Sequence, residues 1–96
     1  MHPSKVRRDA LRQLADLPNI GPAGAADLRL LGIHTPAQVQ GQDPLQLYRQ
    51  LCAKTGTRHD PCVLDVLISI TRFMAGDPPK EWWHYTAERK RMLGTE

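Results

Sequence analysis

Aromatic side chains are scarce in this 96-residue chain, where Phe, Trp and Tyr together make up 5%. No apolar run is long enough to cross a bilayer, and the first residues lack the apolar stretch of a signal peptide. No segment has low complexity, and no repeat recurs with the period of a solenoid. These absences predict a cytoplasmic protein with no membrane partner.

Cysteine is equally rare, with only Cys52 and Cys62 present. Thiols in the cytoplasm stay reduced, so we expect no disulfide between them. A zinc site made of Cys52, His59, Cys62 and His84 is an open alternative, because thiolates and imidazoles suit tetrahedral zinc. The chain lacks the close Cys-x2-4-Cys pair typical of such sites, so we expect no metal and no cofactor.

A strong charge of one sign is also missing. Thirteen Lys and Arg oppose ten Asp and Glu, for a net charge of +3 and an estimated pI of 9.2. This balance mildly favours polyanionic partners. The length predicts a single domain over residues 1–96, large enough for a modest core but not for a core plus a deep catalytic cleft.

Helical patterns fill the chain, and nothing in it is typical of a strand. Proline repeatedly follows a residue that can cap a helix, which marks helix starts. The expected helices span residues 2–17, 22–31, 36–41, 44–54, 61–75 and 86–93. The most apolar of them, 61–75, carries Asp65, Ser69 and Arg72 at helical spacing on one face, so we expect it to be the core helix. The sequence therefore predicts an all-α fold, a compact bundle of five to six short helices.

Residues 14–33, here called the hairpin segment, contain two helical patterns around a tight turn from Pro18 to Gly21. Pro22 takes a first-turn helix position, where its missing N–H costs little. The next amides, on Ala23 and Gly24, begin a helix and suit a phosphate because helix N-termini carry unpaired donors and partial positive charge. A plain αα-hairpin with a glycine turn is the alternative.

The hairpin segment resembles the helix-hairpin-helix motif. Asn19 stands where that family usually has glycine, and asparagine is the other residue that best tolerates positive φ. The positions that match the apolar and glycine pattern are Leu14, Leu17, Ile20, Gly21, Ala25 and Leu28. The resemblance implies a SAM-like fold that holds duplex or branched DNA through backbone amides without reading its sequence.

Carried onto this chain, the resemblance implies phosphate contacts from the amides of Asn19, Gly21, Ala23 and Gly24. It also implies a monovalent cation held by the carbonyls of Ala15, Leu17 and Ile20. Many DNA-binding members carry a lysine beside the glycines, whereas the nearest cation here is Arg29. Further phosphate contacts are expected from four side chains of the first predicted helix, for which a solvated face is the alternative. These are Lys5, Arg7, Arg8 and Arg12.

The order of hairpin, short helix, the run from His59 to Val66 and the pair Trp82-Trp83 resembles a small bacterial family. Its members are labelled pathogenicity-locus proteins or mitomycin resistance proteins, and the hairpin half is similar to the C-terminal domain of TfoX competence regulators. Neither resemblance implies an enzyme, and His59 with Cys62 lacks a third orienting group. We expect a non-enzymatic DNA-binding protein, with a protein–protein interaction module as the alternative.

The C-terminal segment, residues 80–96, gathers four rings between Trp82 and Tyr85, followed by basic residues. Such rings can stack on exposed nucleobases, as they do in single-strand binders. A small bundle also needs every apolar side chain it can bury. We therefore expect this segment to fold back over the core.

Overall fold

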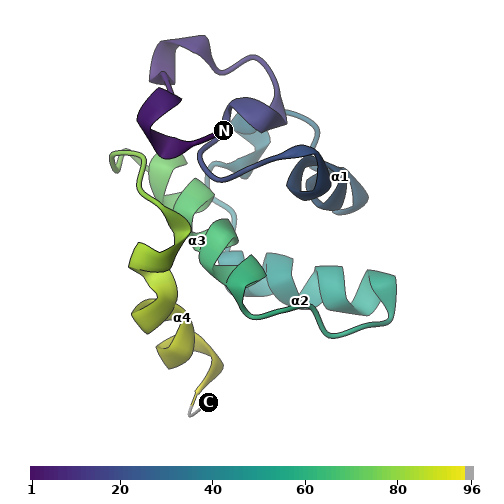
Figure 1. Ribbon diagram of the computed structural model, residues 1–96. Helices are drawn as coiled ribbons and strands as arrows, with labels where there is room; N and C mark the ends of the chain where they lie inside the picture. The colour runs from purple at the N-terminus through teal and green to yellow at the C-terminus, as the bar shows by residue number, and fades with distance from the viewer. Residues whose placement is uncertain (95–96) are drawn as a thin grey trace.

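The computed structural model describes residues 1–94, which form helices and no strand. The four α-helices of this part are α1 (Pro22–Leu30), α2 (Pro44–Thr55), α3 (Cys62–Met74) and α4 (Thr86–Leu93), linked by short 3-10 helices (Figure 1). The Cα radius of gyration is 12.4 Å, close to the value of about 12.5 Å expected for a compact domain of this size. The predicted compact all-α fold is confirmed, and residues 95–96 of the expected C-terminal segment lie outside the described part.

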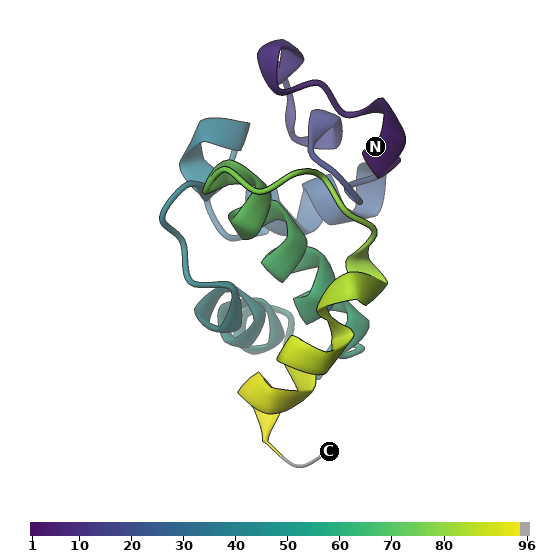
Figure 2. The same cartoon turned by 90° about the vertical axis from the view of Figure 1, so that its left-hand side faces the viewer.

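Helix α3 forms the centre of the molecule. Its side chains Leu64, Ile68, Ile70 and Phe73 are almost entirely shielded from solvent. Helix α2 packs on one side of α3, and α4 with the preceding aromatic turn packs on another (Figure 2). The prediction of a core helix over residues 61–75 is confirmed.

The predicted helix over residues 2–17 is wrong. Three separate 3-10 turns replace it, Pro3–Lys5, Arg8–Ala10 and Leu14–Asp16, with extended residues between them. The Asp16 carboxylate accepts the amides of Arg12 and Gln13 at 2.9 and 3.0 Å, which starts a new turn where a helix would have continued. The predicted helix over 36–41 is likewise a single 3-10 turn, Pro36–Val39.

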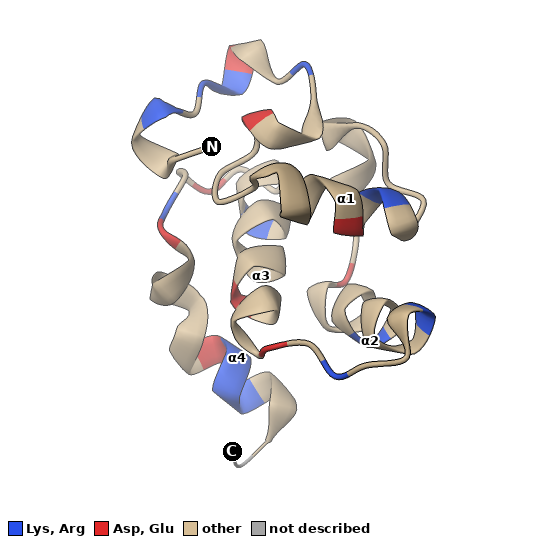
Figure 3. Ribbon diagram, turned by 45° about the vertical axis from the view of Figure 1, so that its right-hand side comes forward, with Lys and Arg blue, Asp and Glu red and all other residues tan. Residues whose placement is uncertain are grey.

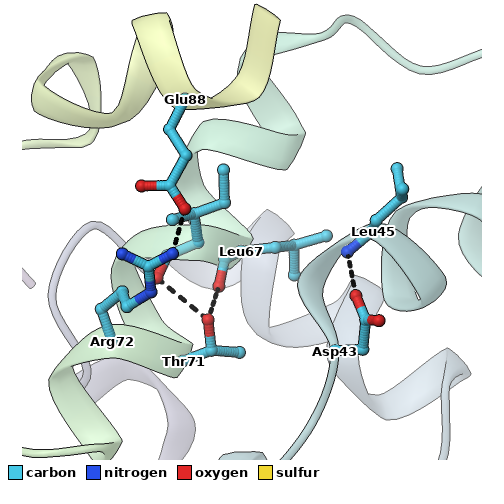
Figure 4. A network of polar contacts seen from close by, with 7 residues as sticks. Asp43, Leu45, Leu67, Thr71, Arg72 and Glu88 are labelled. Atoms are coloured by element: carbon cyan, nitrogen blue, oxygen red, sulfur yellow. Dashed lines mark hydrogen bonds and ion pairs between the residues drawn. The ribbon is translucent and has the colours of Figure 1, made fainter. Parts of the chain in front are cut away.

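Two residues of the polar face predicted on α3, Asp65 and Arg72, form ion pairs with α4. Asp65 is completely buried and accepts hydrogen bonds from Arg89 Nε at 2.8 Å and Thr86 Oγ1 at 2.6 Å. About two helical turns further on, Arg72 pairs with Glu88 (Figure 4). These contacts explain why polar residues recur on the most apolar helix of the chain.

Aspartate caps begin two helices as expected. Asp43 Oδ1 accepts the Leu45 amide at 2.9 Å (Figure 4), and Asp60 Oδ1 accepts the Cys62 amide at 2.9 Å. The Cys62 backbone N–H lowers the pKa of Asp60 below its ordinary value. A lowered carboxyl pKa stabilises the fold above the unfolded-state pKa, and this stabilisation is lost as the pH falls through the folded-state pKa.

Tyr85 carries a buried hydroxyl that has no hydrogen-bond partner among the described residues. We expect Tyr85→Phe to raise the free energy of unfolding by about 1 kcal/mol, because it removes an unsatisfied polar group. The matched control is Tyr48→Phe, since the Tyr48 hydroxyl donates to the His59 carbonyl at 2.5 Å. That change should cost about 1 kcal/mol. Urea denaturation of both variants tests the contrast, and equal losses would contradict it.

Candidate nucleic-acid interface

The hairpin segment packs its predicted apolar anchors into the core. Leu14, Leu17, Ile20 and Leu28 are buried, and so is Ala25 on the inner face of α1. A Cβ atom at position 24 would lie 3.3 Å from Ile20 Cδ1, so glycine there permits close packing between the turn and α1. The turn thus presents its outer side mainly as backbone.

Asn19 adopts the left-handed conformation, with φ of 66°, as the sequence predicted. Its side chain has a second role that the sequence did not indicate. Nδ2 donates to Ser69 Oγ at 3.0 Å and to the Lys80 carbonyl at 2.9 Å. A single asparagine therefore joins the hairpin turn to α3 and to the start of the C-terminal segment.

Three of the four amides expected to contact phosphate, those of Gly21, Ala23 and Gly24, have no hydrogen-bond partner within residues 1–94. Gly21 and Ala23 are exposed at the N-terminus of α1. The Asn19 amide differs, because it donates to the Met1 carbonyl at 2.7 Å. The structure thus leaves a cluster of three unpaired donors at a helix N-terminus.

The carbonyls expected to hold a cation face a positive group of the chain itself. The Met1 amino group donates to Leu17 O at 3.0 Å and to Ile20 O at 2.5 Å. Burial lowers the pKa of this amino group, and the charge of Asp16 opposes that shift. Two of the three carbonyls are therefore already engaged by an ammonium group.

Three of the predicted basic side chains, Lys5, Arg7 and Arg12, line one open hollow of about 310 Å³, with the Asp16 carboxylate on its wall. Figure 3 shows basic and acidic positions spread over the irregular N-terminal segment beside the hairpin. The basic group predicted for a helix face is therefore assembled by a folded loop.

Arg8 points elsewhere. Its guanidinium donates to the carbonyls of Phe73 at 2.7 Å and Asp77 at 2.8 Å, and lies 4.0 Å from the centroid of the Phe73 ring. These contacts cap the C-terminus of α3 and hold the N-terminal segment on it. Arg29 also lies apart, because six residues separate it from Ala23, or about 9 Å along α1.

The aromatic segment divides between the core and the surface. Tyr85 is 6% exposed, as expected for a segment that covers the core, whereas Trp83 is 56% exposed. Trp82 and Trp83 line a second hollow of about 350 Å³, together with Met1–Pro3, Asn19–Gly21 and Glu81. The fold-back prediction is therefore confirmed for Tyr85 and wrong for Trp83. One feature of the sequence could have indicated an exposed ring, namely two adjacent tryptophans in a chain with so few aromatic residues.

The cysteines form no disulfide, and no group of three or more His, Cys, Asp or Glu within residues 1–94 is arranged to hold a metal. His59 Nε2 instead hydrogen-bonds Thr55 Oγ1 at 2.9 Å. The Asp60 side chain raises the pKa of the Cys62 thiol, which opposes the thiolate that a nucleophile or zinc ligand requires. Across the same residues, no helix is long and apolar enough to span a membrane.

Comparison with known proteins identifies a family for this chain. The model of the Cdd1 family, described as pathogenicity locus, matches residues 7–91. The chain is 42% identical over 83 residues to a mitomycin resistance protein, McrB, from Streptomyces lavendulae. The aligned region covers 86% of this chain and 79% of that relative. No solved structure matches the chain. The similarity to TfoX proteins stays a prediction. The chain belongs to the pathogenicity-locus family.

Proposed function

We propose that this chain is a non-enzymatic protein that binds duplex or branched DNA through phosphates, independently of sequence, with residues 14–33 acting as a helix-hairpin-helix motif. The observation that supports this proposal is the set of unpaired amides on Gly21, Ala23 and Gly24. A phosphate placed there satisfies donors that otherwise face water and meets the positive end of the α1 dipole.

The basic hollow supplies the long-range attraction in this proposal. Lys5, Arg7 and Arg12 lie on the segment that leads into the hairpin, so one DNA backbone can approach both surfaces. Such contacts position a duplex without reading its bases. Because only a few phosphates are neutralised, binding is weak, and the slope of log affinity against log salt is small and set by the number of those phosphates.

Fluorescence anisotropy with labelled duplex DNA across a salt series tests the proposal. We expect Arg7→Ala and Arg12→Ala each to reduce the slope of log affinity against log salt by about one, equally for unrelated sequences. Arg8 is unsuitable for this test, because its guanidinium holds α3. A loss confined to one DNA sequence would contradict phosphate-based binding.

Gly21 allows a sharper test of the hairpin amides. Its φ of −106° suits any residue, and a Cβ there meets no atom within 4 Å, so side chains are tolerated. We expect Gly21→Glu to weaken DNA binding about tenfold or more, since its carboxylate repels phosphate at the amides. The isosteric control Gly21→Gln should bind far more tightly than Gly21→Glu. Equal affinities for the two variants would rule out phosphate binding at this turn.

Protein–protein interaction is the second candidate function. Leu30 is 54% exposed on the outer side of α1, and the net charge is modest for a DNA-binding protein. Sedimentation analysis separates the two functions cheaply. An oligomer that Leu30→Gln dissociates, together with no DNA binding at low salt, would favour the interaction module.

A further inference from the structure

We propose that the hollow beside Trp83 binds an unpaired nucleobase, so that the protein prefers junctions between single- and double-stranded DNA over continuous duplex. This inference rests on the proposed DNA binding and names the DNA structure that the site selects. It uses the hollow of about 350 Å³ between the N-terminus, the hairpin turn and the aromatic turn.

Trp83 is the element that points to a base. It is the most exposed of the large apolar side chains, at 56%, with Leu30 next at 54%. Trp82 meets it edge-on with ring centroids 5.6 Å apart, and His84 lies nearly parallel to it, at 22° and 6.4 Å. The ring is thus held in one orientation before any ligand arrives, which lowers the entropic cost of stacking on it.

The charges in the hollow orient such a ligand. Glu81 lines this hollow together with Trp83, and its carboxylate, which lies 3.6 Å from His84 Nε2, repels phosphate. A carboxylate can, however, accept a hydrogen bond from an N–H on the Watson–Crick edge of an unpaired base, such as the N3–H of thymine. The hairpin turn forms another wall of the hollow, where Gly21 offers an unpaired amide for a phosphate. The base therefore lies toward Trp83 and Glu81, and its phosphate lies toward the hairpin.

Asn19 fixes the position of the hairpin turn relative to the aromatic turn, which form two walls of the hollow. Its side chain reaches from the hairpin turn to the Lys80 carbonyl, directly before Glu81. The distance between the phosphate-binding turn and the aromatic turn is therefore set by a hydrogen bond and not by a loose linker. A nucleotide can use both walls at once, which a separate aromatic patch would not allow.

An unpaired base is required because bases inside a duplex stack on one another and hide their faces. Apart from the outer face of a terminal pair, an unpaired base at a fork, overhang or gap is what can present its face to a protein ring. Lys5, Arg7 and Arg12 extend from the same end of the molecule toward the duplex phosphates. The site therefore combines a contact to duplex DNA with a contact to a single strand. A junction between single- and double-stranded DNA offers both.

The test measures affinity for three probes that share one duplex: blunt, with a short dT overhang, and with the same overhang made abasic. We expect wild-type protein to bind the dT overhang about tenfold more tightly than the other two, since stacking on one base contributes on that order. Trp83→Ala should abolish this preference and leave blunt-duplex affinity unchanged. Trp83→Phe, which keeps a ring, should retain part of it.

Trp82→Phe supplies an independent readout, because it leaves Trp83 as the only tryptophan. We expect the dT overhang to quench its fluorescence and the abasic overhang not to. Trp83 is exposed, so Trp83→Ala should keep the wild-type melting temperature, which a thermal scan verifies.

Two results would overturn the inference while leaving the proposed function intact. One is equal affinity for the dT and abasic overhangs, and the other is an equal loss of blunt and overhang binding in Trp83→Ala. Absence of binding to all three probes at low salt would instead reject the proposed function, and the inference with it.

Discussion

Asp65→Ala is expected to lower the free energy of unfolding by about 3–5 kcal/mol, the usual cost of removing one partner from a buried ion pair. Asp65 is fully buried, and the Arg89 side chain is 12% exposed. The variant leaves the Arg89 guanidinium without its carboxylate and the Thr86 hydroxyl without its acceptor. Since small domains are stable by only about 5–15 kcal/mol, we expect partial unfolding at 37 °C. Urea denaturation followed by far-UV circular dichroism measures the loss.

A matched series isolates the buried charge. The double variant Asp65→Leu with Arg89→Met should be more stable than Asp65→Ala, because it removes both charges together. Glu88→Gln, at the more exposed pair with Arg72, should cost much less than Asp65→Ala. A loss below about 1 kcal/mol in Asp65→Ala would show that this pair does not hold α4 on α3.

Asn19→Ala is expected to lower the free energy of unfolding by about 2–3 kcal/mol, the second largest loss of stability among the variants proposed. It forfeits the hydrogen bonds to Ser69 and Lys80, each of which contributes about 1 kcal/mol. It also places an alanine at φ of 66°, a conformation that alanine tolerates less well than asparagine. Chemical denaturation measures the total, and hydrogen exchange should show faster opening of the turn around Pro18.

Asn19→Gly is the control that separates these two causes. Glycine adopts the left-handed conformation without strain and loses only the side-chain contacts. We expect it to retain about 1 kcal/mol more stability than Asn19→Ala. If the two variants unfold at the same urea concentration, the backbone conformation contributes nothing. Because the same side chain aligns both walls of the Trp83 hollow, Asn19→Gly should also reduce the preference for overhangs.

The α-helices could be predicted from sequence to within about two residues, because their ends are marked by local chemistry. Proline after Gly21 and Asp43 begins α1 and α2, and Gly32 and Gly76 follow the ends of α1 and α3 in positive-φ conformations. The N-terminal segment could not be predicted in this way. Its apolar residues have helical spacing, yet the Arg8 guanidinium donates to the Phe73 carbonyl of α3, 65 positions away.

In the candidate site, too, some features follow from local sequence and others from long-range contacts. Asn19 and the small residues of α1 indicate a tight turn with open amides, and both features follow from side-chain size and φ preference. The separation of Arg8 from Lys5, Arg7 and Arg12 depends on where the C-terminus of α3 lies. The exposure of Trp83 depends on the burial of Tyr85, since a short 3-10 turn cannot direct every ring inward.

The sequence by itself determined the helical class, the ends of the α-helices, the core helix and the backbone-lined turn, because each is marked by residue types or by a periodic pattern within one segment. Only the tertiary structure decided which basic groups gather at the hairpin and which ring stands beside it. Those outcomes depend on long-range hydrogen bonds, such as Asn19 to Lys80 and Arg8 to Phe73. Such bonds join residues more than sixty positions apart, and no periodicity of the chain encodes them.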